Sequence, residues 1–531
     1  MTDWLRKIST AAPPAKRPKV SPFRLDLTES HRTLPALQEA LHGFPAATVA
    51  GAYTLPRAAM SAETYALLRG TLRTRPKPSY HMGRRVDKSW DLFVEERGCI
   101  AIPRALGLLL VGAVPPERRR IVEAPVVYDE PAMPLLDREA AAARFKSDQE
   151  THVTALVDDL VAQADGPAGF GSAIYSIPTG HGKTASAIHL TARLGQRTLF
   201  VVPSESLFDQ FEREVHKFLG QELAVGRMWT SNRRKWTKGL AACPVVLTTA
   251  ASAAAAAVDT EGFGLVVVDE AHMCCTAERK RLFLRFPSKY LVLLTATPER
   301  ASNHCGAYLE WLGGKLSCYV RVDFSNNRWG GVDVVELASP FSPLKEVTSK
   351  GEDGRQYVHQ AVMLAKIMRH RERTTWLCRE VAKMVRDEDR HVVCLGVRVE
   401  HLEEVAFRLR KEHDIDAGVL VGTHSDGRPQ TADERTRALE ARVLVAYNSL
   451  GAQALDLPRL DTLLILSGGC AWNNATFWTQ CIGRIIRDKE VKNKPRIVLP
   501  RDRTDGGYFE RQVDRAVTQL KALGDGFSFI Q

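Results

Sequence analysis

The stretch SAIYSIPTGHGKTASAIHL, residues 172–190, decides the fold of this chain. Its first part is apolar and has the length of a buried strand, and the part that begins near Lys183 has the composition of a helix. Gly180 and Gly182 lie between them and suit a tight turn. A strand that passes through a glycine turn into a helix is the repeating unit of parallel α/β sheets.

The same turn has most of a phosphate-binding loop, whose pattern is G-x-x-x-x-G-K-[ST], although Ile177 stands where the first glycine belongs. Backbone N–H groups and the start of the helix would face a phosphate. Lys183 would add positive charge, and the Thr184 hydroxyl would be a ligand for Mg²⁺. Alone, the pattern fits a nucleotide site and a plain strand–turn–helix connection equally well. The candidate nucleotide ligands here are Gly180, His181, Gly182, Lys183 and Thr184.

Strand-length apolar runs recur along the chain in two series. The first comprises TLFVVP (198–203), PVVLTTA (244–250), FGLVVVDE (263–270) and YLVLLTATP (290–298). The second comprises HVVCLG (391–396), AGVLVG (417–422), RVLVAYNS (442–449), TLLILSGG (462–469) and RIVLP (496–500). Continuous apolar strands separated by helix-length segments indicate parallel sheets covered on both faces. The sequence therefore predicts an α/β protein with two tandem parallel-sheet domains.

At 531 residues the chain is too long for one hydrophobic core. The first residues are basic and rich in proline and predict a disordered arm. The next part mixes strand patterns with at least one helix and predicts a small α+β accessory domain. The predicted divisions are an arm at 1–21, an accessory domain at 22–135, α/β domains at 136–325 and 343–531, and a linker at 326–342.

Composition narrows the class of protein. Apolar residues make up 44% and charged residues 25%, as in ordinary soluble domains, and no apolar run is long enough to span a membrane. The ten cysteines include no C-x-x-C pair, which favours reduced thiols and argues against a structural metal site. A formal charge of +11 favours a polyanionic partner such as nucleic acid, although a solvated basic face is the simpler alternative.

Two carboxylates directly follow a buried strand in GLVVVDEAH, residues 264–272. Paired carboxylates are costly beside an apolar strand unless they have a function. Asp269 is placed to hold Mg²⁺, and Glu270 is placed to polarise an attacking water. An acidic pair that caps a helix would explain the two residues alone.

Two threonines and two arginines are further candidate site residues. Thr295 and Thr297 follow another apolar strand, where capping of a turn is the simpler interpretation. In QCIGRIIRDK (480–489), Arg484 and Arg487 lie three apart and share one helix face. Arginines supplied by another domain can stabilise the charge of phosphoryl transfer, although an exposed basic helix face is the alternative.

The order G-K-T, D-E-A-H, T-A-T and Q-x-x-G-R-x-x-R, over about residues 140–500, resembles superfamily 2 helicases of the D-E-x-H type. This resemblance implies two RecA-like domains with ATP and Mg²⁺ between them. It also implies further roles: adenine contact by Gln149, catalysis or sensing by Gln480 and His272, coupling by Thr295, Thr297 and Asp456, and nucleic-acid contact by Pro203, Ser204, Thr248 and Thr249.

A narrower resemblance rests on IPRALGLLLVG (102–112), TATPERASNHC (295–305) and LDLPRLDTLLI (455–465). These phrases are similar to the poxvirus-type transcript-release DNA helicases of large nucleocytoplasmic DNA viruses. The similarity implies an ATP-dependent 3′-to-5′ helicase or translocase in viral transcription or DNA processing. It implies DNA rather than RNA as partner, with transcription machinery as a further partner, and a location in the nucleus, a viral factory or the virion.

The sequence departs from the family pattern at Ile177 and at Ala454, where a glycine is usual in the domain-coupling motif. Two other functions stay open: a double-strand translocase that displaces bound protein without unwinding, and a nucleic-acid-binding scaffold with weak ATPase activity. Trp472, Phe477 and Trp478 could stack on bases, but core packing is the favoured interpretation. The basic runs PAKRPKV (14–20) and RRK (233–235) fit a flexible tail or nuclear-import signal and a solvated face, respectively.

Overall fold

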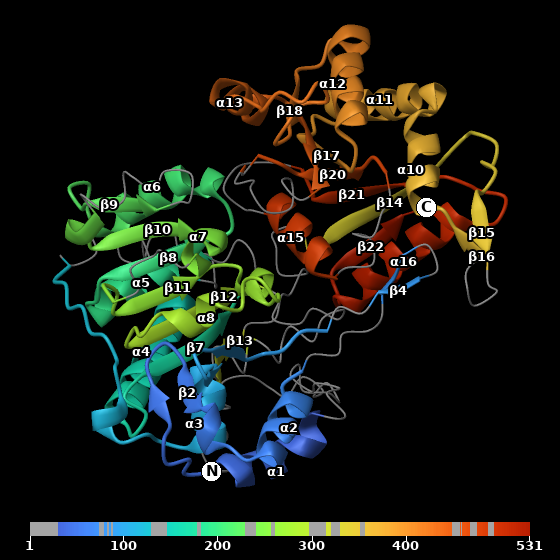
Figure 1. Ribbon diagram of the computed structural model, residues 1–531. Helices are drawn as coiled ribbons and strands as arrows, with labels where there is room; N and C mark the ends of the chain where they lie inside the picture. The colour runs from blue at the N-terminus through green and yellow to red at the C-terminus, as the bar shows by residue number, and fades with distance from the viewer. Residues whose placement is uncertain are drawn as a thin grey trace.

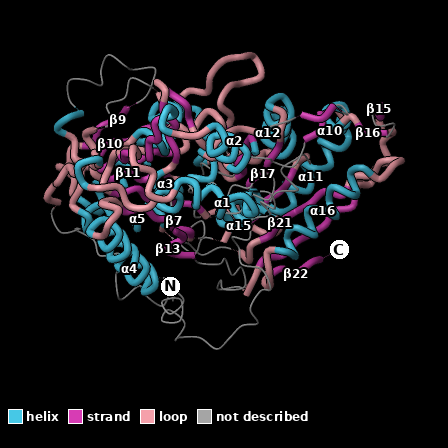
Figure 2. Tube along the Cα trace, turned by 60° about the horizontal axis from the view of Figure 1, so that its bottom comes forward, coloured by secondary structure: helices cyan, strands magenta, loops and turns pink. Residues whose placement is uncertain are grey.

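The computed structural model contains two parallel α/β domains and a small N-terminal domain that lies against the first of them (Figure 1). The structure describes residues 30–73, 79–81, 84–86, 89–128, 146–177, 182–228, 240–255, 261–296, 309, 315–319, 330–350, 356–448, 457, 459–467, 475–486 and 493–530. Within both α/β domains, helices surround the strands on both faces of the sheet (Figure 2).

The first α/β domain is built on a seven-stranded parallel sheet with the order β13-β7-β12-β11-β8-β10-β9. Its strands are β7 (Gly171–Ser176), β8 (Thr198–Val202), β9 (Val225–Met228), β10 (Val245–Thr249), β11 (Leu265–Val268), β12 (Tyr290–Thr295) and β13 (Lys315–Tyr319). Its helices are α4 (Lys146–Asp165), α5 (Lys183–Leu194), α6 (Phe208–Leu219), α7 (Ala250–Ala254) and α8 (Leu282–Arg285). All four apolar runs of the first series form strands, as predicted.

The order of these strands brings distant sequence motifs together. Strand β12 lies between β7 and β11, and all three run parallel. Their carboxyl ends therefore meet at one edge of the sheet, where open α/β sheets bind ligands. Every residue of β7, β11 and β12 is buried, which explains why these strands are continuously apolar and not alternating.

The second α/β domain has another seven-stranded parallel sheet, with the order β18-β19-β17-β20-β21-β14-β22. Its strands are β14 (Val332–Ala338), β17 (Val392–Gly396), β18 (Ala417–Leu420), β19 (Val443–Tyr447), β20 (Thr462–Ile465), β21 (Arg496–Arg501) and β22 (Phe527–Ile530). The helices are α10 (Gln360–Met368), α11 (Arg371–Arg386), α12 (Val399–His413), α13 (Ala432–Glu440), α15 (Ala475–Ile485) and α16 (Tyr508–Ala522). All five runs of the second series form strands of this sheet.

The segment 326–342, predicted as a linker, differs from that prediction. Strand β14 occupies most of its second half and pairs with both β21 and β22. The alternating sequence VDVVELA suits a strand that is only half-buried, and this weaker apolar signal explains why it was not recognised. The predicted boundary at 135–136 stays a prediction, because residues 129–145 lie outside the described ranges.

The N-terminal domain is a four-stranded antiparallel sheet, β1-β2-β6-β5, with three helices. Its elements are α1 (Ser30–Leu41), β1 (Thr48–Val49), β2 (Tyr53–Pro56), α2 (Ala62–Thr71), β5 (Val94–Glu96), β6 (Cys99–Ile102) and α3 (Arg104–Val111). A separate antiparallel pair joins β3 (Ser79–His81) to β4 (Arg84–Val86), and another in the second domain joins β15 (Thr348–Lys350) to β16 (Gln356–Val358).

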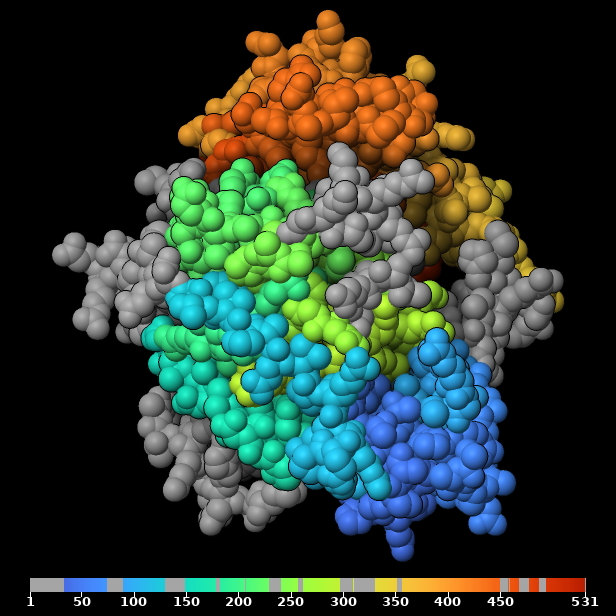
Figure 3. Space-filling view, turned by 60° about the vertical axis from the view of Figure 1, so that its left-hand side comes forward, coloured from blue at the N-terminus to red at the C-terminus, as the bar shows by residue number. Residues whose placement is uncertain are grey.

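The N-terminal domain shares one hydrophobic core with the first α/β domain. Arg104 is buried in this contact, where its Nη1 donates to the Ser288 carbonyl at 2.6 Å and its guanidinium lies 4.7 Å from the centre of the Phe170 ring. Gly107 packs so closely on Tyr53 that an added Cβ would lie 2.2 Å from that ring. The two domains also form a continuous surface, blue to green, in the space-filling view (Figure 3).

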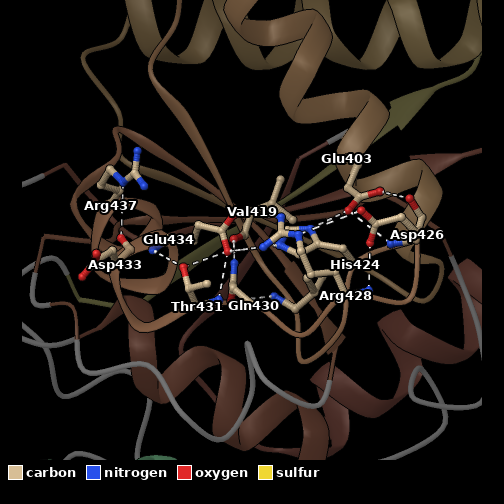
Figure 4. Close-up of polar contacts among 12 residues, drawn as sticks. Glu403, Val419, His424, Asp426, Arg428, Gln430, Thr431, Asp433, Glu434 and Arg437 are labelled. Carbon is tan, nitrogen blue, oxygen red and sulfur yellow. Dashed lines mark hydrogen bonds and ion pairs between the residues drawn. The ribbon is translucent and has the colours of Figure 1, made fainter.

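A polar network in the second domain joins α12 to α13 through the loop that follows β18 (Figure 4). His424 Nδ1 lies 2.7 Å from Glu403 Oε1, and Arg428 makes two 2.9 Å hydrogen bonds to the Glu434 carboxylate. Glu434 also closes a capping box with Thr431 at the start of α13. The basic side chains His424 and Arg428 of this loop are therefore paired with carboxylates of the two flanking helices.

The described residues bear on three questions: membrane spanning, metal binding and disulfide bonding. No helix there combines the length and apolar character that a membrane span requires. No group of three or more His, Cys, Asp or Glu side chains is placed to hold a metal ion among those residues. The cysteines that the structure describes are free thiols.

Candidate active site

Lys183 begins helix α5 at the carboxyl end of β7, as the opening stretch predicts. Gly182 precedes it with a φ of +76°, a left-handed conformation that glycine adopts without strain. Gln149 reaches this turn from α4: a Cβ added to Gly182 would lie 2.6 Å from Gln149 Nε2. The predicted adenine-contacting glutamine therefore lies directly beside the predicted phosphate loop.

Asp269 and Glu270 follow β11, two strands away from the start of this loop. Glu270 has a φ of +46°, a conformation that costs energy for a residue with a side chain and recurs at functional sites. Its backbone N–H donates to Asp269 Oδ1 at 2.9 Å. Lys183 Nζ lies 2.7 Å from Glu270 Oε1, and the two side chains are only 10% and 14% exposed. The G-K-T and D-E-A-H motifs thus meet in one buried ion pair.

His272 and Thr295 extend this pair into a chain of polar contacts. His272 Nδ1 lies 3.0 Å from Thr295 Oγ1 and 3.3 Å from Glu270 Oε2. Both residues are buried, His272 at 2% exposure and Thr295 at 0%. Thr295 is the last residue of β12, so its hydroxyl contacts the histidine at the edge of the sheet.

Arg484 comes to this cluster from the second domain. It lies on α15, on the side of that domain that faces the first in Figure 1. Burial lowers the pKa of its guanidinium, whereas the charges of Glu270 and Asp269 act in the opposite direction. An arginine from one domain thus acts electrostatically on both carboxylates of the other.

The two carboxylates titrate differently for identifiable reasons. Burial raises the pKa of Asp269 to about 6, against the opposing charge of Lys183. Burial also acts on Glu270, but Lys183, His272 and Arg484 outweigh it, and the pKa of Glu270 is lowered. Glu270 is therefore held as a carboxylate, while Asp269 is a buried acid whose ionised form a bound cation would stabilise.

The remaining predicted residues are placed as follows. Gln480 is buried on α15, one turn before Arg484. Phe477 and Trp478 lie in the core of the second domain, as the favoured interpretation predicts. Thr184 is half-buried at the start of α5. Outside the described residues lie Gly180, His181, Thr297, Asp456, Trp472 and Arg487.

The residues predicted to contact nucleic acid lie at the carboxyl ends of the adjacent strands β8 and β10, two directly after β8 and two at the end of β10. Pro203 and Ser204 are half-buried directly after β8. Thr249 accepts a hydrogen bond from the Ser252 N–H at 3.3 Å and so caps α7, whereas Thr248 is fully buried. Their contact with nucleic acid stays a prediction.

Sequence reasoning did not single out Ser176, the last residue of β7. It pairs with Thr295 across the sheet, is 1% exposed, and its Oγ has no hydrogen-bond partner among the described residues. A hydroxyl at the end of an otherwise apolar strand, directly before the glycine turn, is the signal that could have identified it.

Comparison with known proteins agrees with this arrangement. Residues 143–300 match the family described as type III restriction enzyme, res subunit. "Putative helicase 161L" of Invertebrate iridescent virus 6 is 24% identical over 344 residues, which cover 60% of this chain and 70% of that protein. "DNA 3'-5' translocase XPB2" of Sulfurisphaera tokodaii is 24% identical over 355 residues, or 60% of this chain and 75% of that protein. The chain is similar to superfamily 2 helicases.

Other similarities are partial or describe the fold. "Putative helicase 109L" of Invertebrate iridescent virus 3 is 31% identical over 137 residues, 25% of this chain and 41% of that protein. The matches to five relatives span from 41% to 75% of those proteins' lengths. The solved structure of S. cerevisiae Dbp5 bound to RNA and ADP BeF3 has a TM-score of 0.48 at 13% identity and covers 72% of this chain and 93% of that chain.

These similarities imply a nucleotide-using, nucleic-acid-dependent ATPase or helicase activity. Both of its α/β domains have the RecA-like parallel sheet that the sequence predicts. The structure brings together Lys183, Asp269 and Glu270 of the first domain and Arg484 of the second, and their contact with a nucleotide stays a prediction.

Proposed function

We propose that the protein hydrolyses ATP between its two α/β domains and uses each cycle to move 3′-to-5′ along DNA. The observation that carries this proposal is the action of Arg484, from the second domain, on the Asp269–Glu270 pair of the first. A site that needs groups from both domains responds to their separation. Nucleotide binding then closes the two domains and product release opens them again. This hinge movement changes how the two domains contact the nucleic acid.

Lys183 is paired with Glu270 in the structure. A triphosphate brings denser negative charge to the loop, so Lys183 moves to the outer phosphates and releases Glu270 Oε1. Glu270 then accepts a proton from the attacking water, whose oxygen forms a bond to the γ-phosphorus as the bond to the bridging oxygen of ADP breaks. His272 and Thr295 keep the carboxylate oriented through Oε2.

Arg484 and the metal ligand Asp269 would offset the negative charge of the reacting phosphate groups. Arg484 approaches from the second domain and stabilises negative charge on the transferred phosphoryl group. Asp269 and Thr184 would hold Mg²⁺, and they fit this role because the buried Asp269 carboxylate has an elevated pKa that a cation would offset. The ion would neutralise charge on the β- and γ-phosphates.

Nucleic acid would lie across the carboxyl ends of β8 and β10, where it would contact Pro203, Ser204, Thr248 and Thr249. Asp456 and Thr297 would couple the position of the nucleic acid to the state of the nucleotide. The preference for DNA and the polarity are supported by the relative named a DNA 3'-5' translocase. The iridovirus relatives and the resemblance to transcript-release helicases support a role in viral transcription. Binding mainly to backbone phosphates should weaken steeply with salt.

Phosphate release with single- and double-stranded DNA and RNA tests the proposal. We expect DNA to stimulate hydrolysis, and we expect Lys183→Ala and Glu270→Gln to abolish it. Full activity in either variant would contradict the assignment, and hydrolysis that no nucleic acid stimulates would favour a scaffold.

A double-strand translocase is the second candidate, because the name of the Sulfurisphaera tokodaii relative specifies translocation and not unwinding. The two functions give different results in paired assays. A helicase separates the strands of a partial duplex, whereas a translocase displaces the third strand of a triplex without separating the duplex beneath it.

A further inference from the structure

Ser176, the last residue of β7, has a buried hydroxyl that the proposed mechanism does not use. The residue is 1% exposed, and its Oγ has no hydrogen-bond partner among the described residues. A buried hydroxyl without a hydrogen bond destabilises the folded state, because water binds that hydroxyl in the unfolded chain. Alanine would avoid this cost at nearly the same size. A serine at this position is therefore explained by a second state of the site, in which the hydroxyl has a partner.

The pleat of the sheet shows which way this side chain lies. Side chains two residues apart on a strand share a face, so Ser176 lies on the face of Ile174, and Thr295 lies on the face of Leu293. Ile174 and Leu293 belong to one hydrophobic cluster. The same cluster includes both ends of the 3₁₀ helix η7 (Ala271–Cys274), which follows β11. The two hydroxyl side chains therefore lie on one face of the sheet, the face that η7 covers.

Ser176 and Thr295 are direct neighbours on this face. They are paired in the register of the parallel strands β7 and β12, and the Ile177 N–H donates to the Thr295 carbonyl at 3.2 Å. Neighbouring strands lie about 4.8 Å apart, so two hydroxyls that turn toward each other come within hydrogen-bond distance. Rotation about χ1 moves the serine hydroxyl among three staggered positions without a change of volume. Thr295 Oγ1 is therefore within reach of Ser176 Oγ.

Thr295 connects this position to the candidate catalytic base. Its Oγ1 lies 3.0 Å from His272 Nδ1, which in turn lies 3.3 Å from Glu270 Oε2. When Glu270 leaves Lys183 and turns toward the attacking water, the carboxylate moves relative to the histidine ring. The position of that ring then depends on Thr295. A hydroxyl can accept and donate hydrogen bonds at once, so Thr295 can bind Ser176 without releasing His272.

We propose that Ser176 is a positioning residue of the candidate active site, whose hydroxyl donates a hydrogen bond to Thr295 Oγ1 when nucleotide is bound. This bond fixes the Thr295 side chain, and through it the orientation of His272 and Glu270 during hydrolysis. Ser176 directly precedes the stretch IPTGHGKT, so phosphates bound beside Lys183 would act on the end of its strand. The inference rests on the proposed ATPase function and adds a residue that lies outside the sequence motifs.

Thermal unfolding of Ser176→Ala is the first test. Without nucleotide, the Tm of this variant should equal or exceed that of the unaltered protein, because the lost hydroxyl has no partner among the described residues. Adenylyl imidodiphosphate with Mg²⁺ should then raise the Tm of the variant less than that of the unaltered protein, because the hydrogen bond to Thr295 stabilises only the complex. An equal rise in the two proteins would overturn the proposal.

Nucleic-acid-stimulated phosphate release is the second test. Ser176→Ala should lower the rate about three- to tenfold, the effect of one lost hydrogen bond. Thr295→Val removes the threonine hydroxyl but keeps the branched shape of the side chain. If Ser176 acts through Thr295, adding Ser176→Ala to Thr295→Val should lower the rate no further. Two effects that multiply independently would contradict this link.

A matched pair of variants and a control isolate the hydroxyl from the packing around it. Ser176→Thr and Ser176→Val have the same shape, but only threonine has a hydroxyl. We expect the threonine variant to be about three- to tenfold faster than the valine variant, and equal rates would count against the proposal. Ser172→Ala removes another buried serine from the same face of β7 and should leave the rate unchanged. An equal loss in this control would mean that the strand is sensitive to any substitution.

The two measurements separate this proposal from the proposed function. If the unaltered protein showed no stimulated hydrolysis, the ATPase function would be contradicted, and the rise in Tm with the analogue would still decide the role of Ser176. Stimulated hydrolysis at the same rate in Ser176→Ala would leave the ATPase function in place and overturn the role of Ser176. No rise in Tm in either protein would overturn both.

Discussion

The Lys183–Glu270 ion pair makes a counter-intuitive prediction about nucleotide affinity. Lys183 Nζ and Glu270 Oε1 are 2.7 Å apart, and this pair must open before the lysine can reach a phosphate. Glu270→Gln removes the charge that competes with the nucleotide but preserves the size of the side chain. The variant should therefore bind ADP more tightly than the unaltered protein while it loses hydrolysis.

The size of the effect follows from the geometry. At an effective dielectric constant of about 20, two charges at the observed 2.7 Å attract by about 6 kcal/mol. Desolvation of both groups and the hydrogen bond that glutamine retains offset most of this attraction. We therefore expect the free energy of ADP binding to improve by at least about 1.4 kcal/mol in Glu270→Gln, which corresponds to a tenfold tighter complex.

Titration with a fluorescent ADP analogue measures this gain. Glu278→Gln is the matched control, because Glu278 is an exposed glutamate of the same domain. Its affinity for the analogue should equal that of the unaltered protein. If Glu270→Gln bound the analogue equally well or more weakly, the pair would not compete with phosphate, and the described role of Lys183 would be wrong.

Three further predictions concern stability. Gly107→Ala should lower the urea-unfolding free energy by about 1–3 kcal/mol or more, because its Cβ would meet Tyr53 at 2.2 Å; an unchanged midpoint would contradict the close packing of α3 on β2. Burial lowers the pKa of His401 to about 3, below its value in the unfolded chain. The free energy of unfolding should therefore fall by up to about 1.4 kcal/mol per pH unit as the pH drops below about 6.5, and His401→Gln should lessen that fall. Glu434→Ala should cost about 1–2 kcal/mol through the lost capping box, measured by thermal unfolding against Glu440→Ala.

The strands and the nucleotide loop were predictable because their signals are local. Continuous apolar runs such as LVVV before Asp269 have one physical explanation, a strand buried on both faces. The turn at Gly182 was equally clear, since a left-handed residue before a helix favours glycine. Strand β14 was not recognised because it is half-buried and its pattern is weaker.

The contacts that assemble the site were not predictable in the same way. The order of motifs indicated that Lys183 and Glu270 belong to one site, but only the position of β12 between β7 and β11 shows that they pair directly. The link from Thr295 to His272 likewise depends on the relation between two strand ends.

The dependence of the site on the second domain is best tested by Arg484→Ala. Nucleic-acid-stimulated phosphate release is measured together with nucleotide affinity, and Arg437→Ala serves as an exposed control in the same domain. An arginine that stabilises the transferred phosphoryl group contributes roughly 10³–10⁵ to the rate, so hydrolysis should fall by at least about a thousandfold while ADP binding changes little. Hydrolysis within a few-fold of the unaltered rate would contradict a site completed by both domains.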